Sequence, residues 1–221
     1  MKKITMFLVL AMALIIAVPA MAAPKEYIPG VKVETAVQKT ATAKLKYPKV
    51  VMPEKTAVAE RINGYIEQEM AAFQKDHAGE VDTKLTSSYK VRYNSNSILS
   101  VTILEEGYTN KAAHGFKTMR GMNFSTDKGA LLVPADISNM EKNIKMEDTF
   151  AVKNLNAKLQ AAAKAGKVHL LKDFKGITAA PADFYFDKDT RLFVIFQPYE
   201  VAPYSDGVIE LDTGDSLFTI K

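Results

Sequence analysis

Hydrophobic residues recur at helical spacing between Glu54 and Gln74. Positions three and four apart share one face of an α-helix, and here that face is apolar while charged residues fill the other. The apolar positions are Val58, Ile62, Tyr65, Ile66, Met70 and Phe73. The pattern predicts an amphipathic helix over residues 54–74. A second helix is predicted over residues 148–165, because apolar residues again repeat at this spacing and Gly166 follows the last turn.

Strand patterns surround both helices. Residues 31–47 alternate imperfectly and predict one long strand, and a polar turn at Asn94–Ser97 between two alternating runs predicts a hairpin. Further strands are predicted at residues 118–125, 130–133, 208–211 and 217–220, with a second hairpin over residues 184–196. Hairpin turns rather than regular crossovers join these strands. The predicted fold class is therefore α+β, a mainly antiparallel β-sheet with two main helices packed on it.

The first 22 residues have the layout of a secretory signal peptide. Lys2 and Lys3 precede an apolar run over residues 4–18, and small residues follow at 20 and 22. The run is shorter than the roughly 20 residues that a spanning helix needs. We expect cleavage after Ala22, an extracytoplasmic location (periplasmic or secreted) and no membrane span after cleavage.

Charge and cysteine content narrow the class of partner. Removal of residues 1–22 takes away two lysines and no acid, so 27 Lys and Arg remain against 25 Asp and Glu, a formal charge of +2. The lysines from Lys25 to Lys55 are spread among apolar residues, as is typical of solvated strand faces, so no nucleic-acid partner is predicted. The chain has no cysteine, and the stability of an exported protein of this kind must come from its core.

The sequence lacks the usual patterns of catalysis and metal binding. His77, His114 and His169 have no partner at metal-ligand spacing, and no nucleophile elbow or phosphate-binding glycine loop is present. Asp187 and Asp189 resemble the start of a calcium loop, but its later ligands are missing, which favours a plain hairpin turn. We predict no metal site, no cofactor and no catalytic residues.

Paired carboxylates offer an alternative. Glu105 with Glu106, or Glu200 with Asp206, could supply the acid and the base of a small hydrolase that acts on envelope glycans. A sequence does not give the distance between two carboxyl groups, so this alternative stays open here. A purely structural envelope protein is the third possibility.

The segment over residues 197–207 is the strongest candidate for recognition. Two prolines and a glycine interrupt strand pairing there, so the chain must leave the sheet. The segment then presents Tyr199 and Tyr204 beside polar residues, and tyrosine joins a large apolar area to a polar tip suited to interfaces. The pattern favours either a recognition loop or a structural corner of the sheet.

The same residues carry a resemblance to a known family. The chain resembles the domain of unknown function at the C-terminus of RsiV-type lysozyme-sensing anti-sigma factors, a kind of domain that also accompanies PdaC-type peptidoglycan deacetylases. The matching segments are Phe184–Phe186, Leu192–Phe196, Tyr199–Tyr204, Gly207, Ala112–His114 and Met122–Gly129. Residues from about 27 to 108 are similar to the companion domain that precedes it in the family.

The resemblance implies three parts: a signal peptide at 1–22, a PdaC-like N-terminal strand–helix–hairpin subdomain at 23–109, and an RsiV-like C-terminal α+β subdomain at 110–221. Only three residues precede the apolar run, too few for the sigma-binding segment of an anti-sigma factor. No residues remain for the catalytic domain of a deacetylase. We therefore expect neither of these two roles.

What remains is an exported, non-catalytic binding module of the cell envelope that recognises lysozyme, a similar muramidase or peptidoglycan. The expected ligand-binding residues are Tyr199, Glu200, Pro203, Tyr204, Asp206 and His114. The first five lie in the loop described above, and His114 lies in a loop over residues 111–116. The family often has a proline after this histidine, where the present chain has Gly115.

Overall fold

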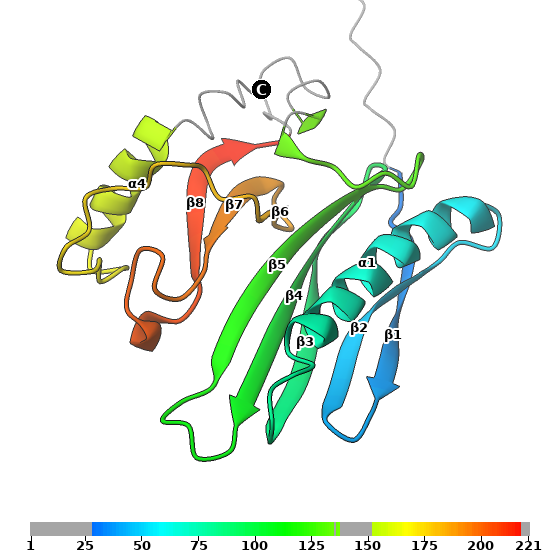
Figure 1. Ribbon diagram of the computed structural model, residues 1–221. Helices are drawn as coiled ribbons and strands as arrows, with labels where there is room; N and C mark the ends of the chain where they lie inside the picture. The colour runs from blue at the N-terminus through cyan, green and yellow to red at the C-terminus, as the bar shows by residue number, and fades with distance from the viewer. Residues whose placement is uncertain (1–27, 135, 138–151, 218–221) are drawn as a thin grey trace, which may run out of the picture.

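Two β-sheets and two main helices form most of the part of the chain that the computed structural model describes, residues 28–134, 136–137 and 152–217 (Figure 1). The predicted signal peptide lies outside these residues. The larger sheet has the order β1-β2-β3-β4-β5, and the smaller sheet has the order β6-β7-β8. The larger sheet comprises β1 (Lys32–Lys39), β2 (Ala43–Val51), β3 (Thr83–Ser95), β4 (Ile98–Thr109) and β5 (Phe116–Ser125). The smaller sheet comprises β6 (Phe184–Phe186), β7 (Arg191–Phe196) and β8 (Ile209–Ser216).

Strand pairing confirms the predicted fold class. Neighbouring strands run antiparallel except β2 and β3, which pair in parallel over Ala43–Leu45. Helix α1 (Thr56–Asp76) and helix α4 (Val152–Lys164) are the two main helices. The fold is α+β with a mixed, mostly antiparallel larger sheet.

Helix α1 covers one face of the larger sheet (Figure 1). Ile62, Ile66 and Met70 of the helix are buried in one cluster with Leu45 and Val101 of the sheet. Each buried aliphatic side chain of this size stabilises the fold by about 1.5–3 kcal/mol relative to exposure. The apolar stripe that predicts the helix is therefore the stripe that the sheet buries.

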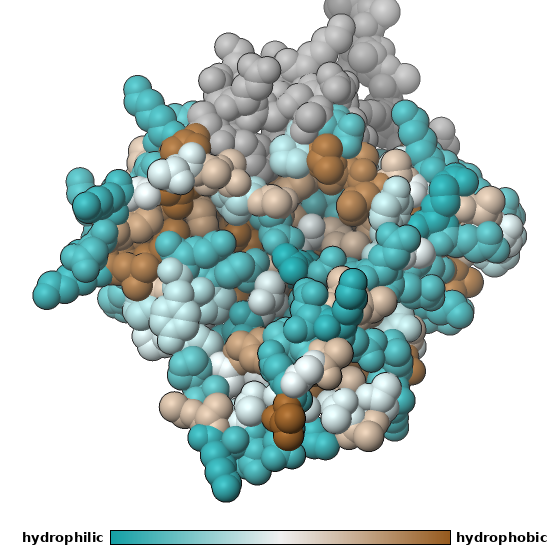
Figure 2. Space-filling view, viewed as in Figure 1, coloured by the Kyte–Doolittle hydropathy of each residue, from teal (hydrophilic) through white to brown (hydrophobic). Residues whose placement is uncertain are grey.

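The smaller sheet and α4 enclose a second hydrophobic cluster. Leu155 and Leu159 of the helix are fully buried and belong to the same cluster as Phe196 and Leu211 of the smaller sheet. Figure 2 shows apolar side chains on the surface beside α4 and the segment that follows it.

None of the helices in the described part of the chain combines the length and apolar composition that a membrane span requires.

A buried polar network joins the two sheets. Successive residues of a strand face opposite sides, so Ser100 points away from α1, as does its partner Asn123 in β5. Ser100 Oγ lies 2.6 Å from Asn123 Oδ1, and Asn123 Nδ2 donates to the carbonyl oxygen of Phe184 at 2.8 Å. The backbone N–H of Phe186 donates to Ser100 Oγ at 3.0 Å. Strand β6 is thus fixed to the face of the larger sheet opposite α1.

Some predicted strand boundaries are wrong. Residues 31–47 do not form one strand, because the chain turns at Thr40, whose side-chain oxygen accepts the N–H of Ala43. The predicted strand at 130–133 is reduced to a bridge from Leu131 to Phe124. Near the end, the strand predicted at 208–211 is longer than expected, because β8 continues to Ser216. The strand predicted at 217–220 lies outside the described residues except for Leu217, and the start of the helix predicted at 148–165 lies outside them too.

Candidate functional site

Two loops meet beside the outer edge of β5. One joins β4 to β5 and contains His114, and the other joins β7 to β8 over residues 197–208. Gln197 attaches the second loop to β5, because its side chain accepts the N–H of Met119 at 2.9 Å and donates to the carbonyl oxygen of Met119 at 2.8 Å. Asp183 accepts the N–H of Gly121 at 3.0 Å on the same strand. These side chains satisfy backbone groups that an edge strand would otherwise leave unpaired.

The 197–208 loop begins with a tight turn that lifts Tyr199 into solvent. The N–H of Glu200 donates to the carbonyl oxygen of Gln197, and Pro198 and Tyr199 occupy the two central positions. Tyr199 has a φ of 71° and is 56% exposed. A type II turn requires positive φ at this position, which glycine adopts freely and other residues adopt at a cost of about 1–2 kcal/mol. A tyrosine at this position is therefore unfavourable for folding.

Substitutions at this position should separate backbone strain from ring contacts. We expect Tyr199→Gly to be more stable than Tyr199→Ala by about 1 kcal/mol, because both remove the ring but only glycine relieves the positive φ. Urea denaturation of the two variants measures the difference. Equal stability, or a more stable alanine variant, would show that the backbone at Tyr199 is not strained.

Three aromatic side chains gather where the two loops meet. The rings of His114 and Tyr204 stack with centroids 4.2 Å apart, and the ring of Tyr199 lies 5.8 Å from Tyr204 and 6.4 Å from His114. The Nζ atom of Lys117 lies 5.1 Å from the centre of the Tyr204 ring. We call His114, Tyr199 and Tyr204 the aromatic cluster. Rings at such separations attract one another beyond the area they bury.

Hydrogen bonding orients the imidazole of His114. Its Nδ1 lies 2.6 Å from the carbonyl oxygen of Gly115, which can only accept, so Nδ1 carries a proton. In the neutral ring, Nε2 then accepts from the hydroxyl of Tyr199, 3.3 Å away. A side chain at position 115 is excluded, because its Cβ would lie 2.5 Å from the carbonyl oxygen of Gly107.

The two acidic residues of the loop serve its own structure. Glu200 Oε2 accepts the N–H of Gln197 at 2.7 Å and so closes the turn. Asp206 Oδ2 accepts the N–H of His169 at 2.8 Å, and this bond holds the pKa of Asp206 below its usual value. Pro203 precedes the short helix η1 (Tyr204–Asp206). Of the six predicted ligand-binding residues, the structure brings three into the aromatic cluster, and the other three shape the loop.

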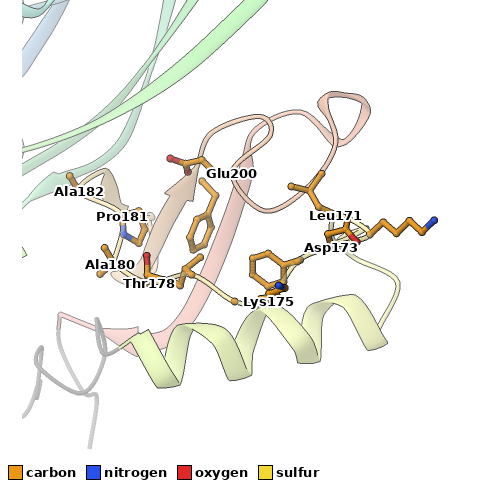
Figure 3. A pocket seen from close by; sticks show the side chains of 14 residues that line it. Leu171, Asp173, Lys175, Thr178, Ala180, Pro181, Ala182 and Glu200 are labelled. Atoms are coloured by element: carbon orange, nitrogen blue, oxygen red, sulfur yellow. The ribbon is translucent and has the colours of Figure 1, made fainter.

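A groove of about 950 Å³ opens beside this loop (Figure 3). Its wall is the segment over residues 171–182, which includes Phe174, Ile177 and Pro181, and Phe196 and Glu200 also line it. Glu200 faces this groove, whereas Asp206 lines a different hollow beside α4. The two carboxylates proposed as a catalytic pair therefore do not share one cleft. Glu105 and Glu106, the other candidate pair, are adjacent in β4 and face opposite sides of the sheet.

Glu105 is instead part of a buried ionic cluster that sequence reasoning did not predict. Its side chain is 3% exposed, and its Oε2 lies 3.6 Å from Arg120 Nε. The same Nε lies 2.8 Å from Glu69 Oε1, and the two form an ion pair whose geometry does not meet that of a hydrogen bond. On its other side, Arg120 Nη1 lies 3.6 Å from Asp183 Oδ2. No described residue hydrogen-bonds to Glu105 Oε1. Burial, and then the negative charge of Glu69, raise the pKa of Glu105 from 4.5 to about 8.

The described residues contain no group of three or more His, Asp or Glu side chains placed to hold a metal ion.

Two residues of the site, Gln197 and Lys117, are not predicted from the sequence. Gln197 could have been suspected from its place before the turn, but Lys117 gives no local signal, because only the meeting of the two loops places it over Tyr204.

The fold and the geometry of the loops define an α+β module with an exposed aromatic cluster. Residues 135–212 match the model of a family described as "Protein of unknown function (DUF3298)". That range contains the β7–β8 loop, whereas His114 lies before it. A search of the curated proteins found no match to this sequence.

Two solved structures have a similar fold. A member of the DUF3298 family from Bacteroides fragilis NCTC 9343 is 14% identical, with a TM-score of 0.56 over 85% of this chain and 91% of that chain. A DUF3298 family protein from Pseudomonas aeruginosa PAO1 is 15% identical, with a TM-score of 0.54 over 83% of this chain and 90% of that chain. At this identity the likeness shows the fold alone.

Proposed function

We propose that this protein is an exported, non-catalytic binding module of the cell envelope and that the aromatic cluster contacts its ligand. The observation that carries the proposal is the gathering of His114, Tyr199 and Tyr204 from two loops, with Tyr199 exposed at a backbone conformation unfavourable for tyrosine. Strain of this kind clusters at functional sites. The predicted signal peptide supports the location, and the resemblance to RsiV-type and PdaC-type proteins supports the envelope role.

Charge favours peptidoglycan over lysozyme as the ligand. A strongly basic partner such as lysozyme would need free carboxylates, but Glu200 and Asp206 accept backbone N–H groups of the protein itself. Lys117, a cation, lies against the Tyr204 ring of the cluster. Peptidoglycan offers sugar rings whose C–H faces pack on aromatic rings, together with carboxylates that a lysine can bind. The aromatic cluster and Lys117 match both features.

Co-sedimentation with purified sacculi tests the proposal. We expect Tyr204→Ala to weaken binding of the exported protein about tenfold or more, because Tyr204 contacts both other rings of the cluster. Tyr65→Ala is the matched control, since Tyr65 is a partly exposed tyrosine on α1, away from the two loops. Thermal melts of both variants check that each remains folded.

Two results would contradict the proposal in different ways. Equal binding of wild type and Tyr204→Ala to sacculi would mean that the loop is only a corner of the sheet. Capture of lysozyme in a parallel pull-down, lost in Tyr204→Ala, would keep the aromatic cluster as the site and replace peptidoglycan by a lysozyme-like protein.

A further inference from the structure

Strand register places lysines in a row on the open face of the larger sheet, the face opposite α1. Lys39 of β1 pairs with Lys44 of β2, and Lys44 pairs with Thr86 of β3. Thr86 pairs with Glu106 of β4, and Glu106 pairs with Lys117 of β5. Directly paired residues share one face of a sheet. The row therefore crosses all five strands on the open face.

Neighbouring rows add three more cations. Lys46 follows two residues after Lys44, and Lys84 and Lys90 lie on the same side of β3 as Thr86. All three are exposed. We call Lys39, Lys44, Lys46, Lys84, Lys90 and Lys117 the lysine face. At the paired strand positions of these rows, Glu106 is the acidic residue on the same face as the lysines. The six lysines outnumber it, so positive charge dominates this surface.

The lysine face continues into the aromatic cluster. Lys117 ends the row at β5, and its Nζ lies 5.1 Å from the centre of the Tyr204 ring. Tyr108, which pairs with Lys84 on β4, is 49% exposed and adds an aromatic surface at the same end of the sheet. Cations, hydroxyl groups and aromatic rings thus form one continuous surface that extends from the 197–208 loop to the opposite edge at β1.

We propose that this surface binds a linear anionic glycan, whose chain extends from the aromatic cluster across the lysine face. The inference rests on the proposed function and extends its site. Lysines two residues apart in a strand are about 7 Å apart, a spacing suited to successive negative groups of an extended polymer rather than to one small anion. Threonine and serine at positions 86 and 88 lie between them and can hydrogen-bond to sugar hydroxyls. Binding of this kind is electrostatic and weakens with added salt.

A four-lysine substitution tests the proposal. The test variant carries Lys39→Gln, Lys44→Gln, Lys46→Gln and Lys90→Gln. Lys84 and Lys117 are left unchanged, because Lys84 donates to the carbonyl oxygen of Ala41 and Lys117 contacts Tyr204. The control variant carries Lys153→Gln, Lys164→Gln, Lys167→Gln and Lys172→Gln, four exposed lysines in and after α4. Both variants lose four positive charges, so only the location of the charges differs.

Binding to heparin and to sacculi is measured at several salt concentrations, in parallel with Tyr204→Ala. Each exposed charge contact contributes a factor of about 1.4 to 5, so the loss of four should weaken binding of the test variant to both probes about fourfold or more, with a shallower salt dependence. The control variant should stay within about twofold of wild type.

The outcomes separate this inference from the proposed function. If the two lysine variants bind both probes equally, the inference is overturned, and loss of sacculus binding in Tyr204→Ala would still support the proposed function. If wild type binds neither probe, the inference is overturned together with peptidoglycan as the ligand. If the test variant loses heparin binding and wild type does not bind sacculi, the lysine face is supported as a binding surface for anionic glycans, but peptidoglycan is not the ligand. If duplex DNA competes for the lysine face more strongly than heparin of equal total charge, the ligand is not a glycan and the inference is overturned.

Discussion

Replacing Glu105 with Gln is expected to raise the free energy of unfolding above pH 8 by about 2–4 kcal/mol, while leaving it unchanged near pH 4. Glu105 is buried between α1 and the larger sheet, and no described residue hydrogen-bonds to its Oε1. Ionisation therefore places a charge where water is excluded. Glu69, Asp183 and Asp76 oppose that charge, and Arg120 offsets part of it.

The sign of the pH dependence follows from the direction of the pKa shift. The pKa of Glu105 is about 8 in the folded protein and 4.5 without the fold, so the unfolded chain releases this proton first. The contribution of Glu105 to stability is complete below pH 4.5 and is lost as the pH rises through 8. Gln has the shape of the protonated acid and cannot ionise, so Glu105→Gln should show a flatter profile.

Chemical denaturation at pH 4, 6, 8 and 9 measures this profile. Glu106→Gln is the matched control, because Glu106 is the next residue of β4 but is exposed on the open face. The control should follow the wild-type profile. Parallel profiles for Glu105→Gln and wild type would mean that Glu105 is already ionised at neutral pH and is stabilised by Arg120.

The fold class could be predicted from the sequence because each helix has one apolar stripe and each hairpin has a local turn signal. The division of the strands into two sheets could not, because it depends on Ser100 and Asn123, polar residues in otherwise ordinary strands that contact the backbone of β6. The turn at Thr40 was missed for a related reason. It contains no glycine or proline, and a threonine side chain makes the bond that stabilises it.

Part of the candidate site could also be predicted. The prolines of the 197–208 loop indicate that the chain leaves the sheet, and Tyr199 and Tyr204 do meet there with His114. The roles of Glu200 and Asp206 could not be predicted, since an acidic residue in a loop gives no sign that it will accept a backbone N–H. Whether the six residues bind a ligand stays a prediction.

Strand register brings together the residues of the lysine face, which lie far apart in the sequence. Lys39 and Lys44 are separated from Lys84 and Lys90 by about 40 residues that include α1, so no clustering is visible along the chain. Parallel pairing of β2 with β3 brings these pairs together on one face. The spread of lysines along the sequence predicts no nucleic-acid partner, and the lysine face gives a specific reason to test that prediction with duplex DNA.

Close contact between the two sheets predicts that Gly121→Ala will destabilise the protein by about 3 kcal/mol or more. A Cβ at position 121 would lie 2.2 Å from the carbonyl oxygen of Phe184 and 2.7 Å from its nitrogen. These are backbone atoms of β6, which the Ser100–Asn123 network holds in place, so they cannot move aside without breaking buried hydrogen bonds. The smaller sheet would have to shift as a whole.

Gly64→Ala is the matched control, and its effect should have the opposite sign. Gly64 lies within α1, and beyond the backbone of its own helix no described atom lies within 4 Å of an added Cβ, so alanine should stabilise the helix by about 1 kcal/mol. Propensity alone would predict stabilisation at both positions, since glycine weakens strand and helix interiors alike. Urea denaturation followed by circular dichroism therefore tests the contact between the sheets directly: a Gly121→Ala variant as stable as wild type would mean that β6 does not approach β5 this closely.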